Sequence, residues 1–240
     1  VTYGAGGGTS EYTAKIAKEV SSLGVTSLAH LSCISSSREL VREQLSNLKA
    51  LGIENILALR GDIPEGLNIN NCDFHYSYEL IDEIKKHGNF CIGGACYPEC
   101  HPESESIEKD IEYIKIKVEH GCEFLTTQMF FDNNILYRFA DRLEKANINA
   151  PIVAGIMPIT SPTKLDRIVT LSGNELPKSF LDNILRFEND PLAFKQAGIE
   201  FATKQARELY KNGFRAVHIY SMNKPEVAKA IQNNLSDVIK

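Results

Sequence analysis

The sequence predicts an α/β fold in which helices cover a parallel sheet. Short apolar or β-branched runs alternate with helical stretches along the whole 240-residue chain. Several of the helical stretches end at a glycine, as at Gly24, Gly52 and Gly121, where a left-handed residue suits a helix end. Strands and helices that alternate at a spacing of about 30 residues are typical of βαβ units, so successive strands are expected to be parallel.

Seven apolar runs predict strands, and each ends in polar, Gly or Pro residues. These runs are Val1–Tyr3, Ser27–Ile34, Asn55–Leu59, Phe90–Ala95, Phe124–Met129, Ile152–Ile156 and Ala216–Tyr220. Helices are predicted between them near Ser10–Ser22, Ser37–Leu51, Tyr78–His87, Ser106–His120, Asn134–Ala146, Pro162–Ser172 and Ile199–Asn212. The long connection Gly173–Gly198 is expected to hold an extra helix at Ser179–Phe187.

The number of units leaves two architectures open. A (β/α) barrel needs an eighth strand, whereas an open doubly wound sheet usually carries a Gly-rich turn after its first strand. Gly4–Gly8 do follow the first predicted strand. Because the sequence contains no linker, repeat or low-complexity segment, a single domain over residues 1–240 is predicted.

Composition excludes several classes of protein. The chain is 43% hydrophobic and 24% charged, with a formal net charge of −5, and such a chain lacks the basic surface expected of a nucleic-acid or membrane-surface binder. It has no apolar run of the roughly 18 residues that a transmembrane helix needs. Val1–Ser10 lacks the zones of a signal peptide, which favours a cytoplasmic location. The six cysteines are therefore expected to be free, buried thiols.

Polar residues gather where the predicted strands end. They lie in the segments Gly4–Gly8, His30, Arg60–Asp62, Cys96–Glu103, Gln128–Asp132 and His218–Lys224. The carboxyl ends of parallel strands share one edge of a sheet, so these segments predict one large site. Structural interpretations stay open: a flexible turn for Gly4–Gly8, a core position for His30, and an ion pair for Arg60 with Asp62.

A metal site is not predicted. Cys91, Cys96, Cys100 and His101 lie close in sequence, but their spacing is not a usual zinc pattern and Pro98 interrupts it.

The predicted helix Ser106–His120 carries two stripes. Its apolar stripe consists of Ile107, Ile111, Ile114 and Val118, and its polar stripe of Asp110, Tyr113 and Lys117. A carboxylate, a phenol and an ammonium in one row suit an extended ligand with hydroxyls and phosphates; a solvated helix face is the alternative.

Five segments together resemble the methylenetetrahydrofolate reductase family. They are Val1–Ala5, His30–Cys33, Leu59–Asp62, Tyr97–Glu103 and Thr127–Asp132. The resemblance runs from Val1 to about Lys229, in order and with compatible spacing. It implies a (β/α)₈ barrel that binds FAD and reduces 5,10-methylenetetrahydrofolate to 5-methyltetrahydrofolate with NADH or NADPH. Folate and nucleotide would take turns at the flavin, which gives ping-pong kinetics.

The resemblance also implies the roles of individual residues. FAD would be held by Thr2, His30, Arg60, Gly61, Asp62, Tyr76, Tyr97, His101, Asp110 and Lys117, with Asp110 at its hydroxyls and Lys117 at its phosphates. Gln128, Tyr220 and Lys224 would contact the folate. Lys224 stands where related enzymes often have Arg, and a Lys cannot grip a carboxylate with two parallel bonds.

Asp62 is the catalytic residue that the resemblance implies. A carboxylate near the flavin disfavours the anionic reduced form and makes the reduced flavin a readier hydride donor. The same charge would stabilise a cationic iminium on the folate.

The family's first strand, which bears the general-acid Glu, is absent from the 240 residues, and this agrees with the seven predicted units. The favoured interpretation is that this βα unit lies outside the given sequence, so that the chain supplies strands two to eight. The alternative is a flavin-binding subunit without independent reductase activity, and a third reading is a pterin-handling methyltransferase barrel without flavin. Open edges at Val1–Tyr3 and Ala216–Tyr220 predict that the chain folds poorly alone. The family usually forms homo-oligomers, and a redox partner protein is a further expectation.

Overall fold

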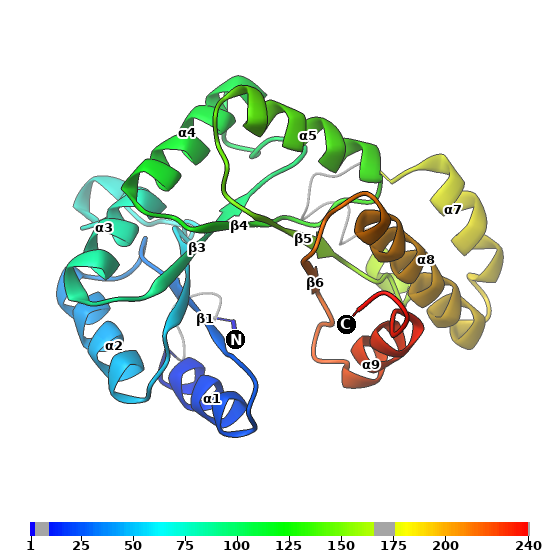
Figure 1. Ribbon diagram of the computed structural model, residues 1–240, viewed down its shortest axis with the longest axis horizontal. Coiled ribbons are helices and arrows are strands. Elements are labelled where there is room, and N and C mark those ends of the chain that lie inside the picture. Colours follow the sequence, from blue (N-terminus) through cyan, green and yellow to red (C-terminus); the bar gives the residue numbers. More distant parts are fainter. Residues whose placement is uncertain (3–9, 166–175, 240) are drawn as a thin grey trace. The chain divides into compact units, whose positions relative to one another are not determined.

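The computed structural model describes residues 1–2, 10–165 and 176–239, in which strands and helices alternate (Figure 1). The strands are β1 (Leu28–Ser32), β2 (Asn55–Leu59), β3 (Cys91–Cys96), β4 (Phe124–Thr127), β5 (Ile152–Ile156) and β6 (Val217–Ile219). The α-helices are α1 (Ser10–Ser22), α2 (Arg38–Ala50), α3 (Ser77–His87), α4 (Ile107–His120), α5 (Asn133–Lys145), α7 (Lys178–Ile184), α8 (Pro191–Lys211) and α9 (Pro225–Asn234). Short 3₁₀ turns are η1 (Ile69–Asn71), η2 (Pro162–Lys164) and η3 (Leu185–Phe187).

The strand order in the sheet follows the sequence, from β1 to β6. The registered pairs β1–β2, β2–β3 and β5–β6 are all parallel. The predicted α/β fold is thereby confirmed. The chain forms two compact units: unit 1 comprises Val1–Ala95 and Glu112–Leu125, and unit 2 comprises Cys96–Ile111 and Thr126–Lys240.

Val1 extends the parallel arrangement of unit 1 beyond β1. Its ammonium donates to the Leu28 carbonyl at 2.6 Å, and its own carbonyl accepts from the His30 amide at 2.9 Å. One residue bonded to the two residues that flank its partner is the pattern of a parallel ladder. Val1 and Thr2 are nevertheless not assigned to a strand, and Tyr3 and Gly4–Gly8 lie outside the described residues, so the strand predicted at Val1–Tyr3 stays a prediction.

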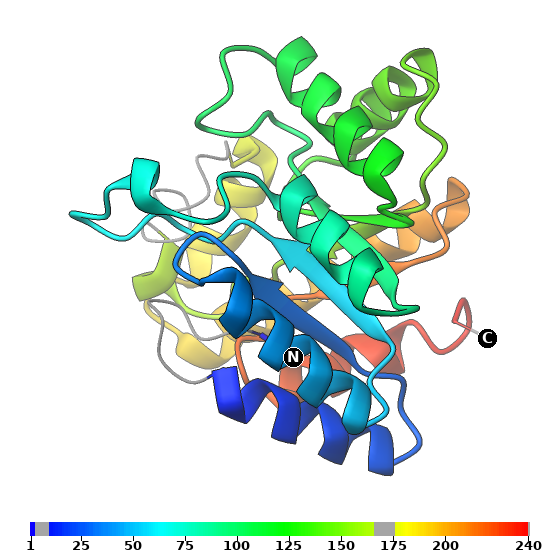
Figure 2. The same cartoon turned by 90° about the vertical axis from the view of Figure 1, so that its left-hand side faces the viewer.

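Alternation in β1 decides which side chains of unit 1 form the core. Ala29 and Leu31 are buried, whereas Leu28, His30 and Ser32 on the other face are half-buried. Figure 2 shows α1 and α2 lying along one side of β1. Apolar residues of α2 and α3 supply the rest of the buried layer, namely Val41, Leu45, Leu48, Leu80, Ile81 and Ile84. Burial of each such side chain contributes about 2 kcal/mol relative to exposure.

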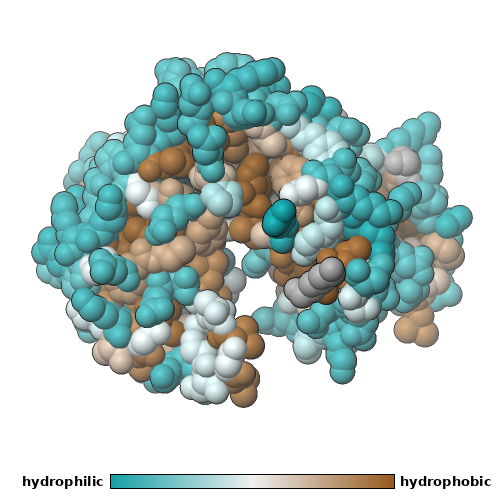
Figure 3. All heavy atoms as spheres, in the orientation of Figure 1, coloured by the Kyte–Doolittle hydropathy of each residue, from teal (hydrophilic) through white to brown (hydrophobic). Residues whose placement is uncertain are grey.

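Unit 2 has an aromatic core between β5, α7 and α8. The rings of Phe180 and Phe201 lie 4.4 Å apart, and those of Phe131 and Phe180 lie 5.9 Å apart. Phe194 and Ile159 are buried in the same cluster. The outward side of α5 is hydrophilic (teal in Figure 3), and its buried residues, Leu136, Phe139 and Leu143 among them, recur at helical spacing.

The largest error in the predicted elements concerns α8. Its start was expected at Ile199, but the helix begins at Pro191, where Asp190 caps it by accepting from the amides of Leu192 and Ala193. An Asp cap followed by Pro at the first position is a helix-start signal. Gly198 looks like a helix end in the sequence, yet it lies inside α8. A glycine is required at this position because a Cβ would overlap the Ile159 carbonyl oxygen.

Smaller differences concern short helical elements that were not predicted or were predicted with other bounds. Neither α9 nor η1 was predicted. The predicted helix Pro162–Ser172 begins as η2, and its remainder lies largely outside the described residues. The extra helix expected at Ser179–Phe187 corresponds to α7 followed by η3.

All six cysteines are free thiols. Cys33, Cys96 and Cys122 are buried, as predicted, whereas Cys72, Cys91 and Cys100 are only half-buried. Within the described residues, no group of three or more His, Cys, Asp or Glu side chains has an arrangement that could hold a metal ion. The helices of the same ranges also include none with the length and apolar character needed to cross a membrane.

We expect Gly198→Ala to destabilise the protein by about 3 kcal/mol, measured as a loss in the free energy of unfolding in urea. The added methyl group meets backbone, which cannot swing aside, and this outweighs the gain of up to about 1 kcal/mol from the better helix former. Gly88→Ala is the control, because its methyl group would meet the flexible end of Lys49 at 3.2 Å and Gly88 has an extended φ of 169°. Equal stability of the two variants would contradict the close approach of α8 to Ile159.

We expect a thiolate-selective reagent to label native Cys72 well before Cys33 or Cys122 at mildly alkaline pH. Burial raises the pKa of the Cys33 thiol to about 12 and that of Cys122 to about 11. Both thiols stay protonated well above neutral pH, and both are shielded from solvent. Mass spectrometry of the labelled peptides gives the order of reaction; labelling of Cys33 as fast as Cys72 in the folded protein would show that this part of the core is open.

Candidate functional site

In unit 1, the segment that follows β2 lies against the end of β1. The Arg60 carbonyl accepts from the amides of Cys33 at 3.1 Å and Ile34 at 2.9 Å. Gly61 adopts a φ of +87°, and a Cβ there would stand 3.1 Å from the Ser32 Cβ. Glycine tolerates both the left-handed backbone and the close approach. The Arg60–Gly61 backbone is therefore fixed at the carboxyl ends of two strands.

The other polar residues predicted in this part of unit 1 lie around the same strand ends. His30 is half-buried on the face of β1 that carries Leu28 and Ser32. Asp62 is exposed, one residue beyond Gly61. Thr2 is exposed and its carbonyl accepts from the Thr13 hydroxyl at 3.0 Å, which ties the segment before β1 to α1.

Aromatic rings form a stack on unit 1. Tyr76 lies between Tyr78, at 5.4 Å between ring centroids, and Tyr113, at 6.0 Å, with nearly parallel planes. Tyr78 also contacts the ring of His120 at 5.1 Å. Tyr76 and Tyr113 are 44% and 42% exposed, so part of each ring remains accessible to a ligand.

Tyr76 is tied to the strand ends of unit 1 through its backbone. The Tyr76 amide donates to the Glu79 carboxylate at 3.0 Å, which closes the first turn of α3. Its carbonyl lies 3.9 Å from the Cys33 thiol that donates to it. The aromatic stack therefore begins beside the segment that carries Arg60 and Gly61.

Lys117 reaches the end of β3. Its ammonium donates to the Ala95 carbonyl at 2.5 Å, and its stem passes close to Gly94. The polar stripe predicted on α4 is thus not a simple solvated face: Lys117 is half-buried, and Asp110 is only 6% exposed.

In unit 2, Asp110 organises the loop after β3. Its carboxylate accepts from the His101 amide at 3.0 Å. The His101 ring meets that of Tyr97 edge-on at 4.5 Å, and its Nδ1 accepts from the Glu103 amide at 3.1 Å. That last bond assigns the proton of a neutral imidazole to Nε2. Two of the residues predicted to bind the cofactor, Tyr97 and His101, therefore lie in one loop, and the third, Asp110, holds that loop from α4.

The end of β4 is held from two sides. The Gln128 amide donates to the Cys96 carbonyl at 2.8 Å, and the Tyr220 hydroxyl donates to the Thr127 carbonyl at 2.8 Å. Tyr220 can lie there because Gly155 has no side chain: a Cβ would stand 2.7 Å from the Tyr220 ring. Burial, followed by the nearby Cys96 and Tyr97, raises the pKa of Tyr220 to about 12, so it remains a neutral donor.

The Gln128 side chain is itself oriented. Its Oε1 accepts from the Met129 amide at 3.0 Å. Because an N–H must face the amide oxygen, this bond fixes which end of the carboxamide is which. The Nε2 group is thereby left as the end available to donate to an acceptor outside the chain.

Lys224 lies in the same connection as Tyr220, between β6 and α9 of unit 2. Its ammonium donates to the Thr160 hydroxyl at 2.8 Å, which links the start of α9 to the segment after β5. Met222 and Asn223, just before it, have positive φ values of 52° and 57°.

The predicted residues thus fall into two sets. Unit 1 brings together Arg60, Gly61 and Tyr76 at the ends of β1 and β2. His30, Asp62 and Thr2 lie on or near these two strands, and Lys117 contacts β3. Unit 2 brings together Tyr97, His101, Asp110, Gln128 and Tyr220 through a continuous run of contacts.

Sequence reasoning missed two features. The first is the extension of the aromatic stack to Tyr78 and His120, which the spacing of Tyr76 and Tyr78 could have indicated. The second is Gln205, a polar residue in the apolar stripe of α8 that lies 5% exposed. A lone amide among Ala202, Ala206 and Leu209 was a readable signal.

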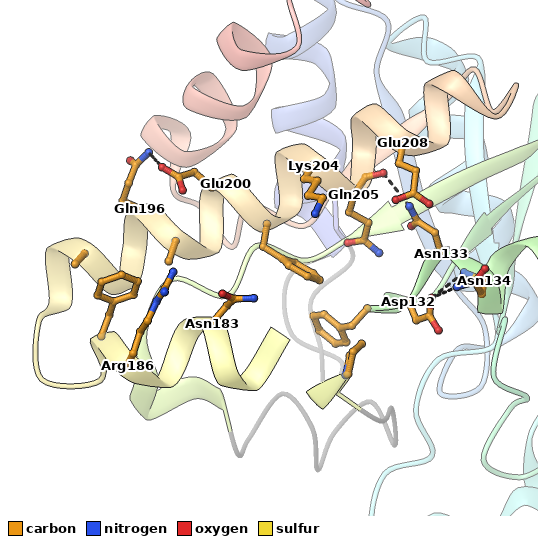
Figure 4. A pocket seen from close by; sticks show the side chains of 16 residues that line it. Asp132, Asn133, Asn134, Asn183, Arg186, Gln196, Glu200, Lys204, Gln205 and Glu208 are labelled. Carbon is orange, nitrogen blue, oxygen red and sulfur yellow. Dashed lines mark hydrogen bonds between the residues drawn. The ribbon is translucent and has the colours of Figure 1, made fainter. Parts of the chain in front are cut away.

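A separate open cavity of about 740 Å³ lies between α5, α7 and α8 of unit 2 (Figure 4). Its walls combine Phe131, Phe187 and Phe201 with the charged side chains of Arg186, Lys204 and Glu200. Asp132 and Glu200 in its lining already accept from Asn134 and Gln196. None of the residues predicted to bind cofactor or folate lines it.

Two solved structures resemble the chain in fold. One is a protein from Clostridium thermocellum described as binding two copies of 5-methyl-5,6,7,8-tetrahydrofolic acid, with a TM-score of 0.57 at 12% identity over 98% of this chain and 92% of that one. The other is 2,3-dimethylmalate lyase, a member of the PEP mutase/isocitrate lyase superfamily, with a TM-score of 0.54 at 8% identity over 95% of this chain and 65% of that one. At such low identity both likenesses concern the fold alone.

Curated relatives are much closer in sequence. Methylenetetrahydrofolate reductase 1 of Schizosaccharomyces pombe is 34% identical over 98% of this chain and 40% of its own length. The 5,10-methylenetetrahydrofolate reductase of Pectobacterium carotovorum is 34% identical over 98% of this chain and 78% of its own length. Methylenetetrahydrofolate reductase (NADH) 1 of Arabidopsis thaliana is 32% identical over 98% of this chain and 42% of its own. The chain therefore spans about two fifths of the eukaryotic relatives and most of the bacterial one.

The family model described as methylenetetrahydrofolate reductase matches residues 1–236, nearly the whole chain. The matched range includes every residue assigned above to the two sets and all the strands and helices from α1 to α9. The chain belongs to the methylenetetrahydrofolate reductase family.

Proposed function

We propose that the chain is the catalytic part of an oxidoreductase that reduces 5,10-methylenetetrahydrofolate to 5-methyltetrahydrofolate with NADH or NADPH. The observation that carries the proposal is the family match over residues 1–236, in relatives whose names state this reaction. In this proposal residues 1–240 act as one catalytic barrel domain that contributes strands two to eight. A homo-oligomer is proposed as the working form.

The residues present fit FAD as the cofactor. Gly61 lets the chain after β2 lie against Ser32, and this holds the Arg60–Gly61 backbone at the strand ends to which the cofactor is assigned. Arg60 and Lys117 supply cations for a diphosphate, and Lys117 is already oriented by Ala95. The exposed parts of Tyr76 and Tyr113 suit contact with an adenine ring.

When bound, FAD would supply hydride transfer between the nicotinamide and the folate, in a ping-pong sequence. The chain's own residues bind and orient. We assign Thr2, His30, Arg60, Gly61, Asp62, Tyr76 and Lys117 of unit 1, with Tyr97, His101 and Asp110 of unit 2, to the cofactor. Asp110 acts in this assignment partly through the His101 backbone that it holds.

The folate is assigned to Gln128, Tyr220 and Lys224. The Nε2 group of Gln128 donates to ring acceptors of the pterin, since its Oε1 is engaged by Met129. Tyr220 presents the side of its ring while its hydroxyl holds Thr127. Lys224 offers a single point charge to a carboxylate of the substrate, with less geometric selectivity than an Arg would have.

Asp62 is proposed to act electrostatically on the substrate. Asp62 is exposed and directly follows Gly61, whose backbone is held at the strand ends. A negative charge there stabilises a cationic iminium on the folate as it forms. The general acid that opens the folate ring is not among the residues assigned here, and the alternative function is a flavin-binding subunit without folate reductase activity.

We expect the purified protein to show a flavin spectrum that bleaches when NADH or NADPH is added without oxygen. Addition of 5,10-methylenetetrahydrofolate should restore the colour, because the folate accepts the hydride. Bleaching without recovery would select the flavin-binding subunit. A protein that binds no flavin even when FAD is supplied would contradict the cofactor assignment.

We expect Asp62→Asn to slow the recovery of colour with 5,10-methylenetetrahydrofolate by about 100-fold, because the charge that favours the cationic intermediate is lost. Bleaching by NADH should change far less. Stopped-flow absorbance separates the two half-reactions. Glu65→Gln is the matched control, since it removes an exposed carboxylate from the same loop. An Asp62→Asn variant with the wild-type rate of recovery would remove Asp62 from the mechanism.

A further inference from the structure

The chain between β4 and α5 contains a buried carbonyl that no sheet ladder satisfies. This carbonyl belongs to Phe130, which is fully buried and lies three residues beyond Thr127, the last residue of β4. A buried backbone oxygen without a donor costs about 1–3 kcal/mol, so the fold must supply one from elsewhere. The segment concerned begins with Gln128, the residue assigned to the folate.

Gln205 of α8 supplies the missing donor. Its Nε2 donates to the Phe130 carbonyl at 2.9 Å. In the opposite direction, the Asn133 side chain of α5 donates to the Gln205 carbonyl at 3.2 Å. Both residues are more than nine-tenths buried, and Figure 4 shows their side chains extending toward each other from α8 and α5. Two reciprocal bonds therefore join α8 to the segment that follows β4.

Together with the bond from Tyr220, these bonds hold the backbone on both sides of Gln128. On its amino-terminal side the Thr127 carbonyl accepts from Tyr220, and on its carboxyl-terminal side the Phe130 carbonyl accepts from Gln205. The Gln128 carboxamide is oriented by the backbone amide of Met129, which lies between the two bonded carbonyls of Thr127 and Phe130. The direction of the Gln128 donors thus depends on a backbone that is held at both ends.

We propose that Gln205 is a positioning residue for folate binding, which acts through Gln128 without touching the ligand. The inference rests on the proposed function, because it takes Gln128 as the residue that meets the pterin. If Gln205 is replaced by a side chain without an N–H donor, the Phe130 carbonyl loses its hydrogen-bond partner. The segment then relaxes to find another donor, and the Gln128 donors lose their direction toward the ring acceptors of the folate.

The test compares two buried polar residues of α8. Gln205→Met keeps the size of the side chain and removes the donor. Thr203→Val is the matched control: Thr203 is buried on the same helix, but its hydroxyl donates to Ile199 within α8. Both variants are expected to lower the thermal midpoint, so stability alone cannot separate them. Isothermal titration with 5-methyltetrahydrofolate, on protein loaded with FAD, gives the dissociation constant of each.

We expect Gln205→Met to raise the dissociation constant about tenfold, the effect of one misdirected hydrogen bond, and Thr203→Val to leave it within about twofold. The rate of flavin bleaching by NADH should stay at the wild-type value in both. In a Gln128→Ala background, Gln205→Met should have no further effect on folate binding, because the residue through which it acts is gone. If Gln205→Met does not fold, Gln205→Asn, which keeps an amide too short to reach Phe130, takes its place.

An unchanged dissociation constant in a folded Gln205 variant would overturn the inference, and so would full additivity with Gln128→Ala. A wild-type protein that binds no folate would instead overturn the proposed function.

Discussion

The need to satisfy carbonyl groups where parallel strands end governs the arrangement of the candidate site. A parallel ladder stops near the carboxyl end of each strand, and the carbonyls at and beyond this end must find donors that the sheet no longer supplies. In this chain Lys117 serves Ala95, Tyr220 serves Thr127, and Gln205 serves Phe130. Two of these three donors are themselves residues assigned to ligands, so the same bonds that finish the sheet also orient the site.

Glycine positions determine how closely these groups approach. Gly61 lets the chain after β2 lie on Ser32, and Gly155 leaves the space in which the Tyr220 ring rests. Gly198 lets α8 approach Ile159, and that approach helps to bring Gln205 within reach of Phe130. In each case the absent side chain determines the position of a polar group several residues or one helix away.

The sequence predicted the fold well because the spacing of its apolar residues and the glycines at its helix ends agree with the observed elements. Apolar runs, intervening helices and helix-end glycines placed β1 to β6 and most helices within a few residues of their observed bounds. The start of α8 failed because Gly198 was treated as a boundary, and the reason for a glycine there is a contact with Ile159, distant in sequence. Local patterns carry no information on such contacts.

The sequence predicted which residues belong to the site, but it did not predict the hydrogen bonds that connect them. Strand-end motifs identified Arg60, Tyr97, Gln128 and Tyr220, and the resemblance to a family supplied their roles. That Asp110 bonds the His101 backbone, or that Gln205 completes the support of Gln128, depends on tertiary geometry. A crystal structure of the protein with FAD and 5-methyltetrahydrofolate tests the account most directly. The account predicts that Gln128 Nε2 donates to the pterin while Tyr220 and Gln205 keep their bonds to Thr127 and Phe130. A folate bound away from Gln128, or a Tyr220 hydroxyl turned from Thr127 to the ligand, would contradict it.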